Sequence, residues 1–443
     1  MRTNKPLGGV KTHEGGTACR ISPIEELRRS VCACLLWEPT FYESGVKVAD
    51  RIKALVAQCA PVAVAELAVE ARSKLHMRHV PLLLARELVR HPKIGQHPKL
   101  AANTVAGVIQ RADEIAEFVA MYWQDGRKPL SKQAKLGLAQ AFGKFNEYSF
   151  AKYNRDGAVK LRDVMFMVHP KPVDAERVAL YKLIAANELA TPDTWEVALS
   201  GGADKKEAFT RLLNEKKLGQ LALLRNLRNM VDAGVDIDLI RDRMNEGATG
   251  SRVLPFRYVA AARAVPRMEP ILDAPMMASM AEMPRLPGKT LLLVDVSGSM
   301  DAPLSEKSDL SRMDAGCALA ALLRGVCDDV RVLSFSNDLV EVPPRGGFAL
   351  IDAVRQSQSH QGTYLRRALE TAASLLLVDR TIVITDEQSH DGCGAPIGRG
   401  YLINVASFQR GVGYGQWTHV SGFSEAVVSF IMALENALPS GRE

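Results

Sequence analysis

The spacing of apolar residues changes once along this chain of 443 residues. From about Ile21 to Ala264, apolar residues recur at intervals of three and four, the period of an amphipathic helix. From Thr290 onward, short apolar runs such as Leu291-Leu292-Leu293-Val294 alternate with further helical patterns. Strands buried on both faces of a parallel sheet are continuous apolar runs, so this second pattern predicts strands alternating with helices. The sequence therefore predicts a helical first part followed by an α/β part.

Helix-breaking residues divide the first part into short segments. Pro61, Pro92, Pro129 and the pair Gly201-Gly202 are examples of the breaks between them. Short helices in antiparallel succession, without an exact sequence repeat, favour an α-solenoid of HEAT-like helix pairs, and a curved solenoid can close into a ring. The predicted helices are residues 24–36, 45–59, 62–77, 80–90, 98–122, 130–151, 174–189, 205–215, 218–232 and 236–246.

Prolines and methionines interrupt the helical pattern over residues 265–290, where we place a domain boundary. This gives a flexible tail over residues 1–20, a helical domain over 21–286 and an α/β domain over 287–443. In the last domain we expect a mostly parallel, doubly wound sheet with helices on both faces. Its predicted strands are 290–296, 329–335, 380–385 and 400–407, and its predicted helices are 311–325, 363–378 and 423–438.

Charge divides the chain at nearly the same place. From Leu291 to the end there are 12 Lys and Arg against 18 Asp and Glu, a net charge of −6. The preceding residues hold 44 against 32, a net charge of +12. A basic first part suggests a polyanionic partner, and an acidic second part suggests a site that gathers a cation.

The bulk composition indicates a soluble cytoplasmic protein. Hydrophobic residues make up 47% and charged residues 24%, and no stretch approaches the ~18 uninterrupted apolar residues of a membrane span. The seven cysteines include no Cys-x-x-Cys pair, which favours buried free thiols in a reducing compartment. We therefore expect no membrane partner.

One loop of the acidic part carries hard oxygen donors at short spacing. Asp295, Ser297 and Ser299 follow an apolar strand, with Gly298 between the two serines. Thr363 opens a predicted helix, and Asp386 follows the predicted strand 380–385. Ligand sites in such sheets lie beyond the carboxyl ends of the strands. Carboxylate and hydroxyl oxygens suit Mg²⁺, with Mn²⁺ or Ca²⁺ as alternatives, and exclude soft thiolate chemistry.

The same five residues resemble the metal-ion-dependent adhesion site of the von Willebrand A domain. The resemblance implies that Asp295, Ser297, Ser299 and Thr363 approach the metal, while Asp386 acts through water. It also implies an open coordination position for an anionic group of a partner. The alternative is that Asp-x-Ser-x-Ser caps a helix or a turn, as short polar residues commonly do. The agreement of three separated segments favours the metal site.

Two basic clusters lie in the helical part, at residues 72–99 and 127–171. Lysine and arginine gain affinity for phosphates by releasing counterions, and Phe145, Tyr148 and Tyr153 could stack on unpaired bases. The alternative is that both clusters are only solvated helix faces. Charge alone does not decide between the two interpretations.

Three motifs of the helical part resemble the TROVE domain of the Ro autoantigen family. They are Arg78-His79-Val80-Pro81-Leu82-Leu83-Leu84, the run from Lys152-Tyr153 to Val168-His169-Pro170-Lys171-Pro172, and Leu223-Leu224-Arg225-Asn226-Leu227. A TROVE domain followed by a von Willebrand A domain is also that family's domain order. The chain is thus identified as resembling a Ro orthologue of bacterial or phage type.

This resemblance implies a monomeric ring of helical repeats closed by a Rossmann-like von Willebrand A domain. Family members bind small structured non-coding RNA (Y RNA) on the outer surface and single-stranded 3′ ends of misfolded RNA in the central hole, and bacterial relatives tether an exoribonuclease through the Y RNA. Lys152 and His169 match family positions that contact RNA, and Arg155 lies in the same basic turn. A buried core histidine is the alternative for His169. Charge density near the motifs adds Arg72, Lys74, Arg78, Lys132 and Lys135 to the predicted RNA-binding residues.

Three functional hypotheses follow. The leading one is an RNA-binding scaffold in RNA quality control, without catalysis of its own, because the sequence shows no nucleophile elbow and no Gly-x-x-x-x-Gly-Lys loop. The second is a metal-dependent protein-interaction module that partners an AAA-type ATPase or a chelatase. The third is a metal-dependent nuclease.

Overall fold

The computed structural model describes residues 22–33, 45–74, 77–153, 157–191, 193–200, 204–250, 253, 255–304, 309–405 and 415–421, together with 427–428, 431–432 and 435. The chain forms two compact units. The first unit comprises Ser22–Leu36 and Lys47–Ala203, and the second comprises Met1–Ile21, Trp37–Val46 and Asp204–Glu443. Over the described ranges, every helix is too short or too polar to cross a membrane.

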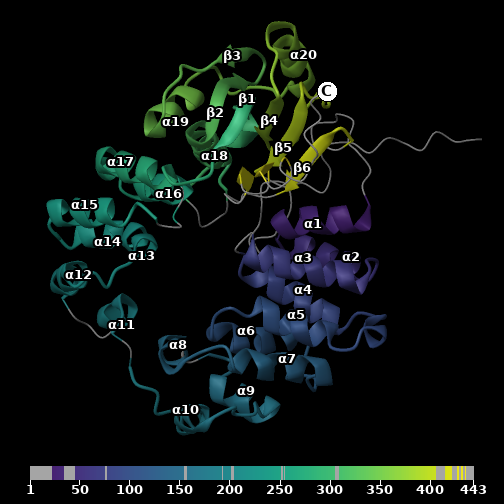
Figure 1. Cartoon of the computed structure of the whole chain (residues 1–443), viewed down its shortest axis with the longest axis vertical. Coiled ribbons are helices and arrows are strands. Elements are labelled where there is room, and N and C mark those ends of the chain that lie inside the picture. The colour runs from purple at the N-terminus through teal and green to yellow at the C-terminus, as the bar shows by residue number, and fades with distance from the viewer. Residues whose placement is uncertain are drawn as a thin grey trace, which may run out of the picture. The chain divides into compact units, whose positions relative to one another are not determined.

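The first unit is a stack of short helices (Figure 1). Helix α4 packs against α3, α5 and α6, helix α7 packs against α5 and α6, and α9 then packs against α6, α7 and α10. One apolar core runs through the stack from Leu27 to Ile184. This succession agrees with the predicted solenoid of helix pairs. Its helices are α1 (Pro23–Ala33), α2 (Gly45–Val56), α3 (Pro61–Ser73), α4 (His79–Val89), α5 (Leu100–Val108), α6 (Asp113–Tyr122), α7 (Lys132–Phe142), α8 (Glu147–Tyr153), α9 (Leu161–Val168), α10 (Ala175–Ala186) and α11 (Trp195–Ser200), with a 3₁₀ turn at Ile94–Gln96.

Two predicted helices are each two helices in the structure. Residues 98–122 divide into α5 and α6, and 130–151 into α7 and α8. The first division occurs where Ile109 turns to extended backbone and the Glu114 carboxylate accepts from the amides of Gln110 (2.8 Å) and Arg111 (3.0 Å). These two amides lie in the turn between α5 and α6, and the carboxylate satisfies both of them. Apolar spacing is nearly continuous through such a corner, so the pattern alone did not reveal it.

In the part of the second unit that the structure describes, six α-helices precede the sheet, and the last of them differs from the sequence analysis. They are α12 (Lys205–Asn214), α13 (Gln220–Arg225), α14 (Leu227–Asp232), α15 (Ile237–Glu246), α16 (Pro255–Ala264) and α17 (Glu269–Met280). Helix α17 lies within the segment 265–290, where we predicted that the helical pattern breaks at a domain boundary. Leu272, Met276 and Met280 are buried at intervals of four residues, so they form an apolar helix face despite the internal Pro275.

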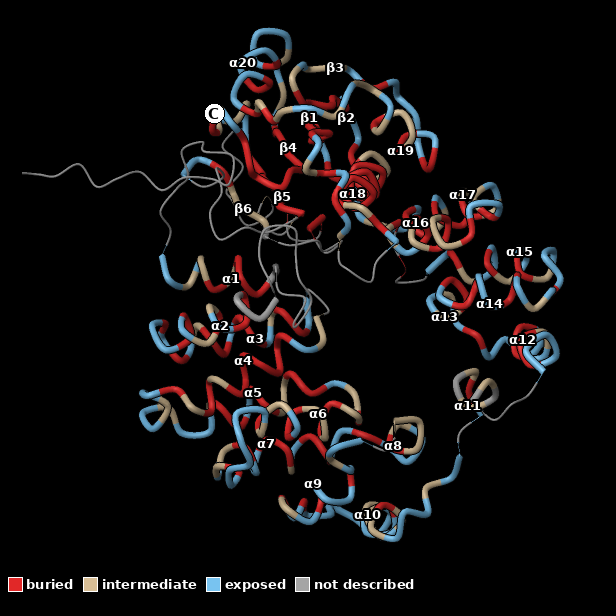
Figure 2. Tube along the Cα trace, turned by 180° about the vertical axis from the view of Figure 1, so that it is seen from behind, coloured by how far each residue is buried: buried red, intermediate tan, exposed pale blue. Residues whose placement is uncertain are grey.

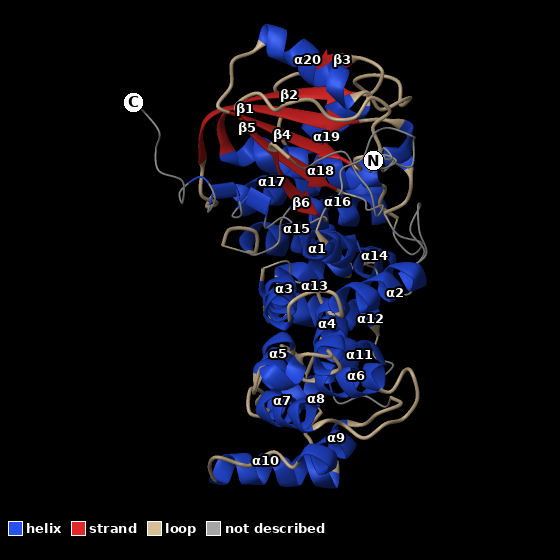
Figure 3. Ribbon diagram, turned by 90° about the vertical axis from the view of Figure 1, so that its right-hand side faces the viewer, coloured by secondary structure: helices blue, strands red, loops and turns tan. Residues whose placement is uncertain are grey.

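The second unit ends in a six-stranded sheet of order β3-β2-β1-β4-β5-β6, drawn in red in Figure 3. All neighbouring strands are parallel except β3, which pairs antiparallel with β2 at one edge. The order is that of a doubly wound fold, as predicted. The strands are β1 (Leu286–Asp295), β2 (Cys327–Phe335), β3 (Leu339–Glu341), β4 (Arg380–Thr385), β5 (Arg399–Asn404) and β6 (Trp417–Ser421), and the helices are α18 (Arg312–Val326), α19 (Gly347–Arg355) and α20 (Leu365–Leu375).

The elements β3, α19 and β6 were missed. Strand β3 is only three residues long and β6 carries weak apolar alternation, whereas α19 was overlooked although Phe348, Ile351 and Val354 recur at helical spacing. The predicted helix 423–438 lies mostly outside the described residues, and its described residues are helical. Helix α18 is buried nearly all round, as its red tube in Figure 2 shows, so it belongs to the middle of the second unit.

Helices α16 and α17 pack against α18 and α19 and so join the helical and α/β segments. The Arg263 guanidinium reaches the Asp314 carboxylate (Nε to Oδ1, 3.0 Å), and Asp273 accepts from the amide of Phe348 at the start of α19 (2.8 Å). The compact unit therefore continues across residue 286, where β1 begins. The division into domains at residues 286/287 stays a prediction.

Candidate functional site

The predicted metal-binding residues lie at the carboxyl ends of β1 and β4. Because these strands are parallel neighbours, Asp295 at the end of β1 and Asp386 just after β4 lie at the same edge of the sheet. The hydroxyl of Thr385 donates to Asp295 (Oγ1 to Oδ2, 2.5 Å). In a doubly wound sheet this edge, between the two central strands, is where ligands bind.

The other predicted ligands come from two loops that are tied to this edge. Ser297 and Ser299 lie with their hydroxyl oxygens 3.3 Å apart. The amide of Gly298 donates to the carbonyl of Gln361 (2.9 Å), which joins the serine loop to the loop that carries Thr363. Thr363 is buried, and its carbonyl accepts from the amide of His390 on the segment after β4 (2.9 Å). The fold thus joins all three predicted segments through hydrogen bonds.

The donor chemistry fits a hard cation. Asp295 and Asp386 are both fully buried, where desolvation and the repulsion between the two carboxylates disfavour their charged forms. Burial, and then the nearby charge of Asp386, raise the pKa of Asp295 above its ordinary value. A cation at this edge would offset both effects. No group of three or more His, Cys, Asp or Glu that suits a metal occurs in the described part of the chain, so hydroxyl oxygens would have to supply the remaining protein ligands.

Two charged residues that the sequence analysis did not name also lie at this edge. The buried Arg312 guanidinium is 3.3 Å from Asp386 (Nη1 to Oδ2), so part of the negative charge is already balanced. The fully buried Glu387 accepts from Asn404 (2.9 Å) and faces His419 (Nε2 to Oε1, 2.9 Å). Glu387 also has a positive φ of 61°, which is unusual for a residue other than glycine. Arg312 opens a helix, where sequence alone favours a solvated side chain.

In the first unit, most of the basic cluster at residues 72–99 is neutralised by carboxylates. Arg78 binds Asp113 and Glu117, while Arg86 and Arg90 both bind Asp125. These acidic residues lie 35 to 39 positions further along the chain. Lys74, by contrast, is exposed. The cluster is therefore mainly an internal ion-pair network.

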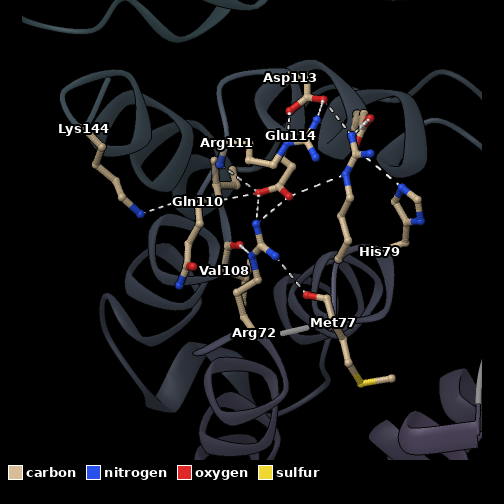
Figure 4. A network of polar contacts seen from close by, with 12 residues as sticks. Arg72, Met77, His79, Val108, Gln110, Arg111, Asp113, Glu114 and Lys144 are labelled. Atoms are coloured by element: carbon tan, nitrogen blue, oxygen red, sulfur yellow. Dashed lines mark hydrogen bonds and ion pairs between the residues drawn. The ribbon is translucent and has the colours of Figure 1, made fainter. Parts of the chain in front are cut away.

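Arg72 is the clearest correction among the predicted RNA-binding residues. It is 8% exposed, and its guanidinium donates to the carbonyls of Val108 (2.9 Å) and Met77 (3.1 Å) and to both oxygens of Glu114 (2.6 and 2.9 Å). Figure 4 shows this guanidinium between the backbone carbonyls and the Glu114 carboxylate. An arginine held in this way links α3, α5 and α6 and has no accessible face for a phosphate.

The second basic cluster presents its cations to solvent. Lys132 and Lys135 are exposed on α7, and Lys152 is half-buried on α8. His169 is exposed at the left-handed end of α9 (φ 48°), so the alternative of a buried core histidine is wrong. Arg155 lies outside the described residues. For Lys132, Lys135, Lys152 and His169, no described carboxylate lies within ion-pair distance, so these side chains remain available to a polyanion.

Exposed aromatic rings accompany these cations. Tyr148 is 54% exposed one helical turn before Lys152, and Phe166 is 52% exposed between Arg162 and His169 on α9. Residues spaced by three or four lie on one helix face, so each ring has a basic neighbour. The sequence analysis named Tyr148 as a stacking residue but did not name Phe166.

Comparison with known proteins agrees with this architecture. Residues 185–285 match the family model of the TROVE domain, a segment that contains α11 to α17 and the motif Leu223–Leu227. The crystal structure of the Deinococcus radiodurans Ro (RSR) protein superposes with a TM-score of 0.61 and 19% sequence identity, over 93% of this chain and 99% of that chain.

A shorter match connects the chain with telomerase protein component 1 of Mus musculus. The two are 31% identical over 87 residues, which is 18% of this chain and 3% of the mouse protein. The chain therefore spans only a small part of that relative. The motifs at residues 78–84 and 152–172 lie outside the segment that the family model matches. These findings agree with the resemblance: residues 185–285 are similar to the TROVE domain, and the chain has the fold of the Deinococcus Ro (RSR) protein.

Proposed function

We propose that this protein is an RNA-binding scaffold whose helical first unit holds the RNA. The observation that carries the proposal is the pairing of accessible cations with exposed aromatic rings on α8 and α9, with Lys132 and Lys135 on α7 as further cations. Cations bind the phosphate backbone, and exposed rings stack on unpaired bases. The same elements would serve a folded RNA through its phosphates and a single strand through its bases.

The family resemblance makes the proposal more specific. The RNA would be a small structured non-coding RNA of the Y type on the outer surface, with single-stranded 3′ ends of misfolded RNA entering a central hole. The scaffold would then act in RNA quality control, with an exoribonuclease tethered through the RNA. Lys132, Lys135, Lys152 and His169 are the proposed contacts, with Lys74 as a further exposed cation. Arg72 is no longer among them, and Arg78 is occupied by its carboxylates.

A divalent cation, Mg²⁺ in the first instance, is part of the proposal for the second unit. Asp295, Ser297, Ser299 and Thr363 would hold it, with Asp386 acting through water. The cation would supply an electrophilic position for a carboxylate or phosphate of a partner. This chain's own residues bury most of the site and bring the three loops together, and Arg312 balances Asp386. The site would organise binding rather than catalysis.

Filter binding of structured and single-stranded RNA across a range of salt concentrations tests the RNA proposal. We expect affinity to fall steeply as salt rises, because bound counterions are released. Lys152→Glu should weaken binding, while Lys205→Glu, which makes the same charge change at an exposed position of α12, should have a smaller effect. Little affinity, or affinity that does not respond to salt, would contradict the proposal.

A protein-interaction module that partners an AAA-type ATPase is the second candidate, and the predicted metal site is the observation that favours it. Asp295→Ala should abolish any increase in unfolding temperature on adding Mg²⁺, whereas Asp338→Ala, at an exposed carboxylate, should retain it. If RNA affinity is lost in Lys152→Glu and kept in Asp295→Ala, the scaffold proposal is favoured. If RNA affinity is lost in Asp295→Ala alone, RNA binding would belong to the second unit and not to the first.

A further inference from the structure

A cavity of about 310 Å³ opens in the first unit beside α6. One wall comes from α6 and the residues just before it, and the other from Tyr153 and residues 157–161. Its polar lining consists of Arg78, Arg111, Asp113, Glu117 and Tyr153. Small side chains, among them Ala116, Ala120 and Ala158, line the rest. The volume lies at the lower end of the range for small-ligand pockets.

The charges of this cavity cancel. Arg78 binds Asp113 (Nη2 to Oδ2, 2.7 Å) and Glu117, and Arg111 binds Asp113 through Nη2 (2.8 Å) and Nε (3.2 Å). Two cations thus face two carboxylates, so a free phosphate would gain little attraction here and would meet two negative groups. A neutral ligand with hydrogen-bond donors and acceptors suits this lining better than an anion.

The cavity also contains a planar stacking surface. The Arg111 guanidinium lies over the Tyr153 ring, 4.4 Å from its centroid, and Asp113 holds that guanidinium at two nitrogens. The Lys152 ammonium is 5.6 Å from the same ring. Arginine planes and aromatic rings are the surfaces on which proteins stack unpaired bases. The small side chains of Ala116 and Ala120 on α6 leave space in the cavity for a flat group.

We propose that this cavity holds a single unpaired nucleobase of a bound RNA, stacked on the Arg111–Tyr153 pair. The proposal rests on the proposed RNA-binding function and adds to it a site for a base rather than a phosphate. The cavity supplies donors from Arg111 and acceptors from Asp113 and Glu117, which match the mixed edge of a base. Lys152, next to Tyr153, would hold the adjoining phosphate.

The test uses a single-stranded oligouridylate with one central 2-aminopurine, whose fluorescence is quenched when the base stacks. Ala120→Leu fills the cavity from the exposed side of α6 and changes no charge. Ala179→Leu, at an exposed position of α10, is the matched control. We expect the wild-type protein and the control to quench the fluorophore alike. We expect Ala120→Leu to remove the quenching and to weaken binding roughly tenfold, with the dependence on salt unchanged.

Failure of this inference and failure of the proposed function give different results. If Ala120→Leu binds and quenches as the wild-type protein does, the base pocket is wrong and RNA binding stands. If the wild-type protein does not bind the oligonucleotide, the RNA function is wrong and the pocket assignment with it. Should Ala120→Leu lose helical circular dichroism, Tyr153→Leu replaces it, because it removes the ring from a half-buried position. Unchanged quenching in that folded variant would also overturn the proposal.

Discussion

Replacing Arg72 by methionine removes a buried guanidinium but keeps most of the aliphatic volume of the side chain. The substitution leaves the fully buried Glu114 carboxylate without its closest cation and the carbonyls of Val108 and Met77 without their donor. Removing one partner of a buried ion pair costs about 3–5 kcal/mol. For a unit of this size, such a loss lowers the unfolding temperature by roughly 10 °C.

The loss of folding stability in Arg72→Met should grow as pH rises. Burial already raises the pKa of Glu114 above 4.5, and loss of Arg72 raises it further. A carboxyl whose pKa is higher in the folded than in the unfolded state binds more protons when folded, so stability falls as pH rises through that interval. The variant should therefore be closest to the wild-type protein near pH 4.5 and furthest from it above the raised folded pKa. The double variant Arg72→Met/Glu114→Gln should recover part of the loss.

Thermal unfolding followed by far-UV circular dichroism measures these differences. Lys53→Met is the control, because Lys53 pairs with an exposed Asp50 three residues away, and surface pairs contribute less than about 1 kcal/mol. Folded Arg72→Met should bind RNA as the wild-type protein does. If its unfolding temperature matches that of Lys53→Met, or if it stays stable and loses RNA affinity, then the structural role assigned to Arg72 is refuted.

Three further predictions concern packing, reactivity and binding. Gly137→Ala should destabilise the first unit by about 1–3 kcal/mol, because an added Cβ would lie 2.5 Å from the Ala102 carbonyl oxygen. A urea titration measures this loss, and Gly95→Ala, where the added Cβ meets open space, is the control. Burial raises the pKa of Cys317 to about 12, so mass spectrometry after iodoacetamide treatment at pH 8 should find its thiol unmodified, and early modification would contradict the packing of α18. Phe166→Ala should leave the unfolding temperature unchanged and weaken single-stranded RNA binding roughly tenfold, and equal RNA affinity would exclude stacking on this ring.

Secondary structure was predictable wherever the local pattern was long and regular. The strand 380–385 was placed at its observed bounds, and β1, β2 and α18 lie within a few residues of their predicted positions. Apolar spacing reports which face of a segment is buried, and this holds for long elements whatever their partners. Apolar spacing does not reveal where one helix ends and the next begins, so α5 and α6 were predicted as one helix. It also failed to predict α17, in which prolines and methionines form the buried helix face.

The order of the candidate metal residues was likewise visible in the sequence. Each follows or precedes an apolar strand or a helix start, and parallel strands bring such positions to one edge. The other charged residues at this edge were not predictable, because they come from distant elements. Arg312 comes from α18, Glu387 follows β4, and its partner His419 lies in β6. Their partners are chosen by the sheet order and not by any local spacing.

By itself the sequence determined that this chain has a basic helical part and an acidic α/β part, and which motifs each part carries. Only the tertiary structure decided which of the basic residues are accessible to solvent. Arg72 and Arg78 are close in sequence to Lys74, yet carboxylates 35 to 42 residues away neutralise the two arginines, while Lys74 is exposed. A charge in the sequence has no assigned counter-charge until the helices stack, because burial and pairing arise from neighbours in space.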